Sequence, residues 1–297
     1  MASRMRANGA EPKTRTPGDF LRRCLREISR HEKAVLSGND PDAVHDMRVA
    51  SRRLRAALAF LKSALPERTW RRALRRARRV TRAAGDLRQF DVNAQLLDRL
   101  IAEAAEVRPA AEFARPFLAA DRVLALTTSR KALRRADPGK LRKEVQHLAR
   151  LLDDRDLQAL SRPAAKKAAR RARRLSRLWG SNGAGPGLGA STVDKARLHA
   201  IRIATKKLRY HLETGKRICG WQVEAAIETA REIQDAFGEL HDDESLRHWC
   251  ESHRDEAAGY MGELIRFLGR REAAAIARIA SKHGKSHETL IARLADT

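Results

Sequence analysis

The chain has 297 residues, and 62 Lys and Arg against 37 Asp and Glu give it a formal net charge of +25. This surplus predicts attraction to anionic polymers or surfaces. No apolar run is long enough to cross a bilayer, and the N-terminus lacks an apolar signal core, so we expect neither a membrane span nor a secretory signal. Ala, Leu and Arg dominate while strand signals are close to absent, which predicts an all-α fold.

The three cysteines also bear on the compartment and on metal binding. Cys24, Cys219 and Cys250 are odd in number, far apart and not spaced as metal ligands. We therefore expect reduced thiols that pack between helices, a cytoplasmic protein, and no metal site or cofactor.

In chain order, residues 1–17 are polar and aperiodic and predict a disordered tail. A helical first half is predicted over 18–179, with a helix that starts at Asp40-Pro41 and ends before Pro66. Breaks are expected near Gly85, Pro109, Pro116, Asp137-Pro138-Gly139 and Pro163. The glycine-rich stretch 180–192 predicts a flexible linker, and Ser191–Asp194 resembles a capping box that opens the second half, 193–297.

Two segments of the chain repeat one another without a gap. Val44–Arg55 matches Leu198–Arg209, with His, the first Arg, Ala, Leu and the last Arg identical. Gly85–Arg88 and Gly238–His241 form a second match at almost the same separation. Two matches in the same order predict an internal duplication.

On a helix, each copy of the repeat places its cations in one narrow stripe beside an apolar stripe. The first stripe contains His45, Arg48, Arg52 and Arg55, with Lys62 at its edge. The second contains His199, Arg202, Lys206 and Arg209, with Lys216 matching Lys62. Rows of cations suit a linear polyanion, and Arg can grip two phosphate oxygens at once. If a two-fold pseudo-axis relates the halves, the two stripes can face each other across a shared groove.

Another basic helix, Trp70–Arg82, is predicted to widen this surface. Its candidate cations are Arg72, Arg75, Arg76 and Arg79. The stretch Ala164–Arg177 is equally basic, and there a solvated helix face is as good an explanation as a binding role.

The paired motifs resemble those of the CHAD family, the conserved histidine α-helical domain. The resemblance rests on Val44–Leu58, Leu198–Tyr210 and Gly85–Val92, and covers roughly residues 18 to 295. It implies two pseudo-symmetric four-helix bundles with a basic central groove or pore. It also implies binding of inorganic polyphosphate, association with polyphosphate granules and no catalytic activity. Divalent ions are expected only as counterions that the ligand carries.

Nucleic acid is the alternative ligand, because charge alone attracts it as well. Against it, few aromatic residues lie near the stripes to stack on bases, and no helix-turn-helix or RNA-recognition signature occurs. An enzyme acting on phosphate chains would need metal-holding acids among the cations, and the stripes have none. His241-Asp242-Asp243 alone is weak evidence for a metal site. The sequence therefore predicts a binding protein and not an enzyme.

Overall fold

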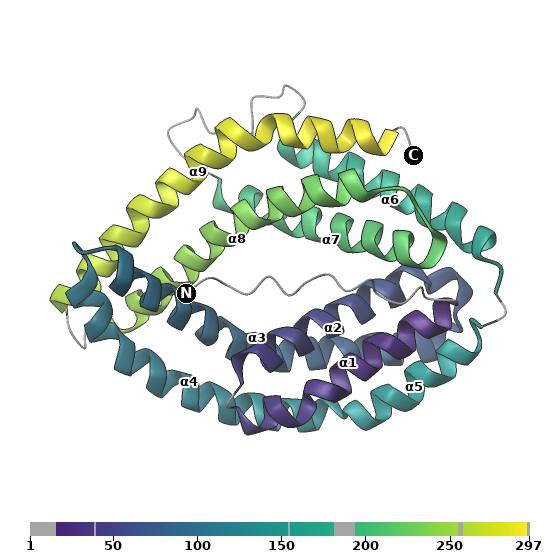
Figure 1. Ribbon diagram of the computed structural model, residues 1–297, viewed down its shortest axis with the longest axis horizontal. Helices are drawn as coiled ribbons and strands as arrows, with labels where there is room; N and C mark the ends of the chain where they lie inside the picture. Colours follow the sequence, from purple (N-terminus) through teal and green to yellow (C-terminus); the bar gives the residue numbers. More distant parts are fainter. Residues whose placement is uncertain (1–15, 39, 154, 181–193, 255–257, 296–297) are drawn as a thin grey trace.

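The computed structural model describes residues 16–38, 40–153, 155–180, 194–254 and 258–295, and every regular element in these ranges is helical. In chain order the elements are α1 (Pro17–Ser37), α2 (Pro41–Phe60), the short 3-10 helix η1 (Lys62–Ala64), α3 (Glu67–Glu103), α4 (Arg108–Ala136), α5 (Pro138–Arg150), α6 (Leu157–Trp179), α7 (Lys195–Cys219), α8 (Glu224–Ser252) and α9 (Ala258–Ala295). The all-α prediction is confirmed (Figure 1). Of the predicted tail and linker, residues 1–15 and 181–192 lie outside the described ranges.

Side-chain caps set where the helices begin. Thr16 and Asp19 form a reciprocal capping box at the start of α1, so the last two residues of the predicted tail are ordered. Asp40 Oδ1 accepts a hydrogen bond from the Ala43 backbone N–H at 3.0 Å, which confirms the predicted start of α2. Asp194, the last residue of the predicted capping box Ser191–Asp194, is the N-cap residue of α7.

The predicted breaks have mixed outcomes. Asp137, with a φ of 56°, separates α4 from α5 as predicted, and Pro109 lies in the first turn of α4. Gly85, Pro116 and Pro163 lie inside continuous helices, so those three predictions were wrong. In α4 the reason is packing, because Ala114 and Leu118 on either side of the proline are buried in the core and hold the helix together.

Three hydrophobic cores hold the helices together. The first lies among α1, α2, α5 and the adjoining parts of α3 and α4, around Leu21 and Leu54. The second lies among α6, α7 and the adjoining parts of α8 and α9, around Trp179 and Phe237. The third joins the remaining parts of α3, α4, α8 and α9, around Leu97 and Leu246. The four long helices thus belong to two cores each and converge at one end of the molecule (Figure 1).

Helix α6 packs with the second half of the chain, although the sequence places it in the first. Its residues Leu175 and Trp179 are fully buried in the second core, and α6 contacts α7 and α9. Only Leu160 and Ala164, near its start, belong to the first core. The boundary between the two groups of helices therefore falls before α6, because the apolar stripe of α6 continues toward Trp179 and needs α7 to cover it.

Two junctions connect α2 to α7, away from the third core, and α4 to α8, where Trp249 belongs to that core. At the first, the rings of Phe60 and His211 lie 4.9 Å apart, and His211 Nε2 lies 2.9 Å from the carbonyl oxygen of Ala164 on α6. At the second, Asp121 accepts a hydrogen bond from Trp249 Nε1 at 2.7 Å. These contacts fix how the two groups of helices sit against each other, and hence how α2 faces α7.

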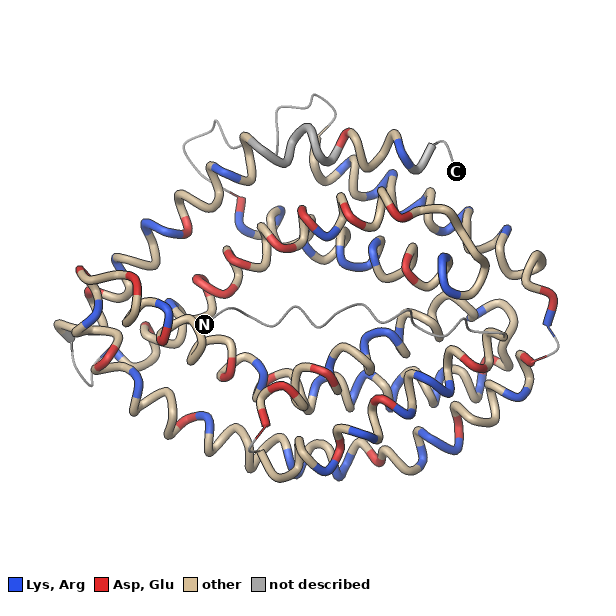
Figure 2. Tube along the Cα trace, in the orientation of Figure 1, with Lys and Arg blue, Asp and Glu red and all other residues tan. Residues whose placement is uncertain are grey.

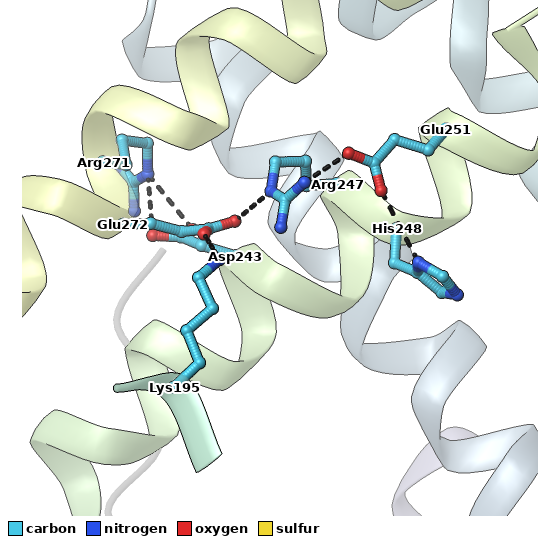
Figure 3. Close-up of polar contacts among 7 residues, drawn as sticks. All are labelled: Lys195, Asp243, Arg247, His248, Glu251, Arg271 and Glu272. Carbon is cyan, nitrogen blue, oxygen red and sulfur yellow. Dashed lines mark hydrogen bonds and ion pairs between the residues drawn. The ribbon is translucent and has the colours of Figure 1, made fainter. Parts of the chain in front are cut away.

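Buried carboxylates hold the start of α7 to α8 and α9 (Figure 3). Glu272 on α9 is 5% exposed and accepts from Arg247 Nε of α8 at 2.5 Å and from Lys195 Nζ of α7 at 3.2 Å. Asp243 on α8, 3% exposed, accepts from Arg271 Nε of α9 at 3.2 Å. Buried acids with such partners tie three helices together by charge-assisted hydrogen bonds.

We expect Glu272→Gln to lower the free energy of unfolding by about 1–3 kcal/mol, because the change leaves Arg247 and Lys195 without a buried counter-charge. Glu251→Gln is the matched control, because Glu251 pairs with the same arginine but is 40% exposed, so that change should cost about 0–1 kcal/mol. Urea denaturation measures both. Equal losses in the two variants would show that burial of Glu272 adds nothing.

Candidate anion-binding site

Helix α2 presents the predicted cations beside its buried stripe. Met47, Leu54 and Leu58 are fully buried in the first core. The side chains of Arg48, Arg52 and Arg55 are half-buried along the adjacent face, one turn apart. The predicted separation of an apolar stripe from a cationic one therefore holds in α2.

Helix α7 repeats the arrangement and faces α2. Ile201, Leu208 and Leu212 are buried in the second core, while the cations of the same turns stay half-buried. The two helices are in contact, so their cations act on one another across the junction. Together they form what we call the basic cluster, namely Arg48, Arg52, Arg55, Arg202, Lys206 and Arg209. Figure 2 shows Lys and Arg positions along both helices.

The pKa values show how strongly these charges are crowded. Burial, then repulsion from Arg52 and Arg202, lowers the pKa of Lys206 to about 7. Burial, with repulsion from Arg52 and Arg202, likewise lowers the pKa of Arg48 to about 10. Arg52 of α2 lowers the pKa of Lys206 on α7, and Arg202 of α7 lowers the pKa of Arg48 on α2. The two stripes therefore share one electrostatic environment.

Five of the six cations of the basic cluster have no direct ion-pair partner in the described ranges. Within the described ranges, Arg48, Arg52, Arg55, Arg202 and Lys206 form no ion pair within 4.0 Å and donate no hydrogen bond to the protein. The Nε of Arg55 is buried without an acceptor. Half-buried cations without partners repel one another and are poorly hydrated. A bound anion would supply both the counter-charge and the acceptors.

Helix α3 extends the cluster through residues that the sequence did not single out as ligands. Repulsion from Arg78 and Arg82 adds to burial in lowering the pKa of Arg55. Further along the same face, Gly85 lets the Arg48 guanidinium approach the helix, because a β-carbon there would lie 2.7 Å from Arg48 Nη1. Arg88 adds to the repulsion on Arg48. Gly85 thus leaves room for Arg48 and does not break the helix.

Helix α8 contributes a histidine and acids at the Arg202 end. Burial, then the charges of Arg202 and Lys206, lowers the pKa of His241 to about 4. Burial raises the pKa of Asp242 to about 6, against the pull of Arg202. The sequence contained a pattern that could have identified Arg88 and His241, because they are the last residues of the matching segments Gly85–Arg88 and Gly238–His241.

Several predicted residues lie outside the basic cluster. Lys216 pairs with Glu224 at 2.6 Å, and Arg76 pairs with Glu144 of α5 at 3.1 Å, so neither charge is free for a ligand. Lys62 and three of the predicted arginines of α3, Arg72, Arg75 and Arg79, are exposed. Arg75 and Arg79 share a helix face with Arg78 and Arg82, the arginines of α3 that act on Arg55, because these four lie three or four residues apart. The part of the predicted residues of α3 in binding stays a prediction.

The two histidines of the repeat lie at the margin of the cluster. Partial desolvation, then the charge of Arg88, lowers the pKa of His45. His199 acts on His241 of α8 and is exposed. Neither histidine forms a hydrogen bond or ion pair in the described ranges, and each lies at the end of its stripe opposite Arg55 or Arg209. Arg209 itself is partly neutralised by Glu213, at 3.7 Å.

Two further properties concern the described residues as a whole. They contain no group of three or more His, Cys, Asp or Glu side chains placed to hold a metal ion, and this includes His241 and its neighbours. None of their helices is both long and apolar enough to cross a membrane.

Comparison with known proteins agrees with this geometry. Residues 19–251 match the CHAD domain. The chain belongs to the CHAD domain family. The fold is similar to the crystal structure of the CHAD domain from the plant Ricinus communis, with a TM-score of 0.63, 20% identity, and coverage of 94% of this chain and 90% of that one. It is also similar to PptA from Streptomyces chartreusis, with a TM-score of 0.60, 16% identity, and coverage of 95% and 98%. No curated protein matches the chain significantly.

The crowding of this CHAD domain predicts a stability gain from removing one charge. We expect Lys206→Met to raise the free energy of unfolding of the anion-free protein by about 1–2 kcal/mol near pH 7, once solvent screening is allowed for. The folded-state pKa of Lys206, about 7, lies below the ordinary value of 10.5. Between pH 7 and 10.5 the unfolded chain therefore binds more protons at Lys206 than the folded chain does. The free energy of unfolding of the wild-type protein rises with pH in this range, and the difference from Lys206→Met shrinks.

Urea denaturation at several pH values tests this expectation. Lys216→Met serves as the control, because Lys216 is paired with Glu224 and its loss should bring no gain. A loss of stability in Lys206→Met at neutral pH would contradict the proposed crowding.

Proposed function

We propose that this CHAD domain binds inorganic polyphosphate along the basic cluster and does not turn it over. The observation that carries the proposal is the set of unpaired, half-buried cations that α2 and α7 hold against one another. Between Arg48 and Arg55 the helix rises about 10 Å, so the charges form a short line that suits a chain of phosphates. Membership of the CHAD domain family supports polyphosphate as the ligand.

The composition of the cluster favours a bare phosphate chain over a nucleic acid. Guanidinium groups can each hold two phosphate oxygens, and five of the six cluster cations are arginines. The aromatic side chain beside them, Tyr210, already lies under Arg209, at 4.9 Å from its guanidinium carbon. Exposed bases would find little to stack on, whereas phosphates need only the cations.

The absence of turnover is also part of the proposal. Its support is the placement of the acids, because Asp242 and Glu244 lie at the Arg202 end of the cluster and do not alternate with the cations. Such an arrangement suits holding a phosphate chain. We further propose a cytoplasmic role at polyphosphate granules, which the family resemblance and the reduced cysteines support.

Replacing Arg48, Arg52, Arg202 and Lys206 together with Gln should weaken binding of long-chain polyphosphate at least about a hundredfold. The charge-matched control changes the exposed cations Arg68, Arg134, Arg150 and Lys143 to Gln, and should weaken binding only a few-fold. Fluorescence titration at physiological salt measures both. Equal losses would indicate diffuse attraction instead of a site.

Competition then distinguishes the ligand classes. Unlabelled polyphosphate should displace labelled polyphosphate more effectively, per charge, than single-stranded DNA, RNA or heparin. Nucleic acid that competes equally well would favour the alternative of a nucleic-acid-binding protein.

Incubation of the full chain with polyphosphate and Mg²⁺ should release no phosphate above the buffer background, because the proposed role is binding alone. A colourimetric phosphate assay measures this. Steady release that is lost in the variant of the four cluster residues would overturn the non-catalytic proposal.

A further inference from the structure

Cations continue beyond the basic cluster onto α6. Lys167, Arg171 and Arg174 lie four and three residues apart and so share one face of that helix. We call these three residues the α6 face. Its position is fixed by contacts, because Lys167 Nζ donates to the Ala59 carbonyl of α2 at 2.6 Å and Arg171 Nη1 donates to the Lys207 carbonyl of α7 at 2.7 Å. The α6 face therefore lies beside the C-terminal part of α2 and the middle of α7, near Arg55 and Lys207.

The charges of the α6 face are coupled to the cluster through a continuous series of neighbours. Lys207 is lowered in pKa by burial and then by Arg174, Arg171 and Arg55. Arg55 is in turn coupled to Arg52 of the cluster. Neighbouring cations therefore form a continuous series from α2 and α7 to α6.

The opposite end of the cluster carries charges of both signs. Beyond Arg202 lie Asp242 and Glu244 of α8, which attract this arginine, and Arg88 and Arg99 act on Asp242 in turn. Behind them, Asp243 and Glu272 are buried in the ion-pair network of Figure 3. A polyanion that extended this way would meet carboxylates among the cations, whereas past Arg55 the charges that act on Lys207 are cations.

We propose that the α6 face is an extension of the polyphosphate site that only long chains reach. This inference rests on the proposed function. A short chain occupies the basic cluster alone. A longer chain leaves it past Arg55 and Lys207 and gains further contacts along α6, so affinity rises with chain length until the α6 face is filled.

The test uses two charge-matched variants of the full chain. Arg174→Gln with Lys207→Gln removes two exposed cations from the path, and neither side chain makes a hydrogen bond or ion pair in the described ranges. Lys166→Gln with Arg173→Gln removes two exposed cations from another side of α6, because these residues lie seven positions apart and off the α6 face. Circular dichroism checks that both variants keep their helicity, and Gln retains good helix propensity.

Titration with polyphosphates of graded length, from tripolyphosphate to long chains, gives the readout. For the path variant we expect about tenfold weaker binding of long chains, unchanged binding of the shortest chains that bind, and a plateau of affinity at a shorter length. Its slope of log affinity against log salt should fall by about one for each cation removed. The variant on the other side of α6 should change each of these little.

The outcomes separate the two proposals. Equal losses in both variants, or a plateau at the wild-type length in the path variant, would overturn the extension while leaving the basic cluster as the site. A wild-type chain that binds no polyphosphate of any length would overturn the proposed function, and the extension with it.

Discussion

The mutual repulsion of unpaired cations is the constraint on which the rest of the structure depends. Arg48 and Arg52 of α2 and Arg202 and Lys206 of α7 are brought together without an ion pair to any carboxylate in the described ranges. Apolar packing must outweigh that repulsion, and it does so on the other side of the same helices, where Leu54 and its equivalents are fully buried. Each helix is therefore divided lengthwise, with one stripe stabilising the fold and the adjacent stripe opposing it. This is the usual conflict between stability and a functional surface.

Connections at several points keep the repelling helices in place. The shared core of the long helices holds one end of the molecule, and the contact of Phe60 with His211 holds α2 against α7. The network around Glu272 fixes the start of α7. Because these attachments lie around the basic cluster and not within it, the cations can stay unpaired without the helices separating. Net charge alone would not produce such a site.

The helical periodicity of the repeat was enough to predict the stripes of α2 and α7, because side-chain direction in a helix follows directly from spacing. Periodicity did not single out Arg78 and Arg82 of α3, which the packing of α3 against α2 brings near Arg55. The grouping of α6 with α7 was equally hidden, since a glycine-rich linker separates them in sequence while Trp179 packs in the core that they share. Tertiary partners, which no local pattern specifies, decided these cases.

Gly85 gives the Arg48 guanidinium room beside α3. A glycine in the middle of a helix costs about 1 kcal/mol relative to alanine. Here a β-carbon would lie 2.7 Å from Arg48 Nη1, so the missing side chain leaves space for the guanidinium. Arg48 makes no hydrogen bond to the protein in the described ranges, so its donors stay available to a phosphate. A planar guanidinium also loses less side-chain entropy per hydrogen bond than a lysine does. A half-buried arginine row therefore suits phosphate binding better than the more numerous exposed cations elsewhere on the chain.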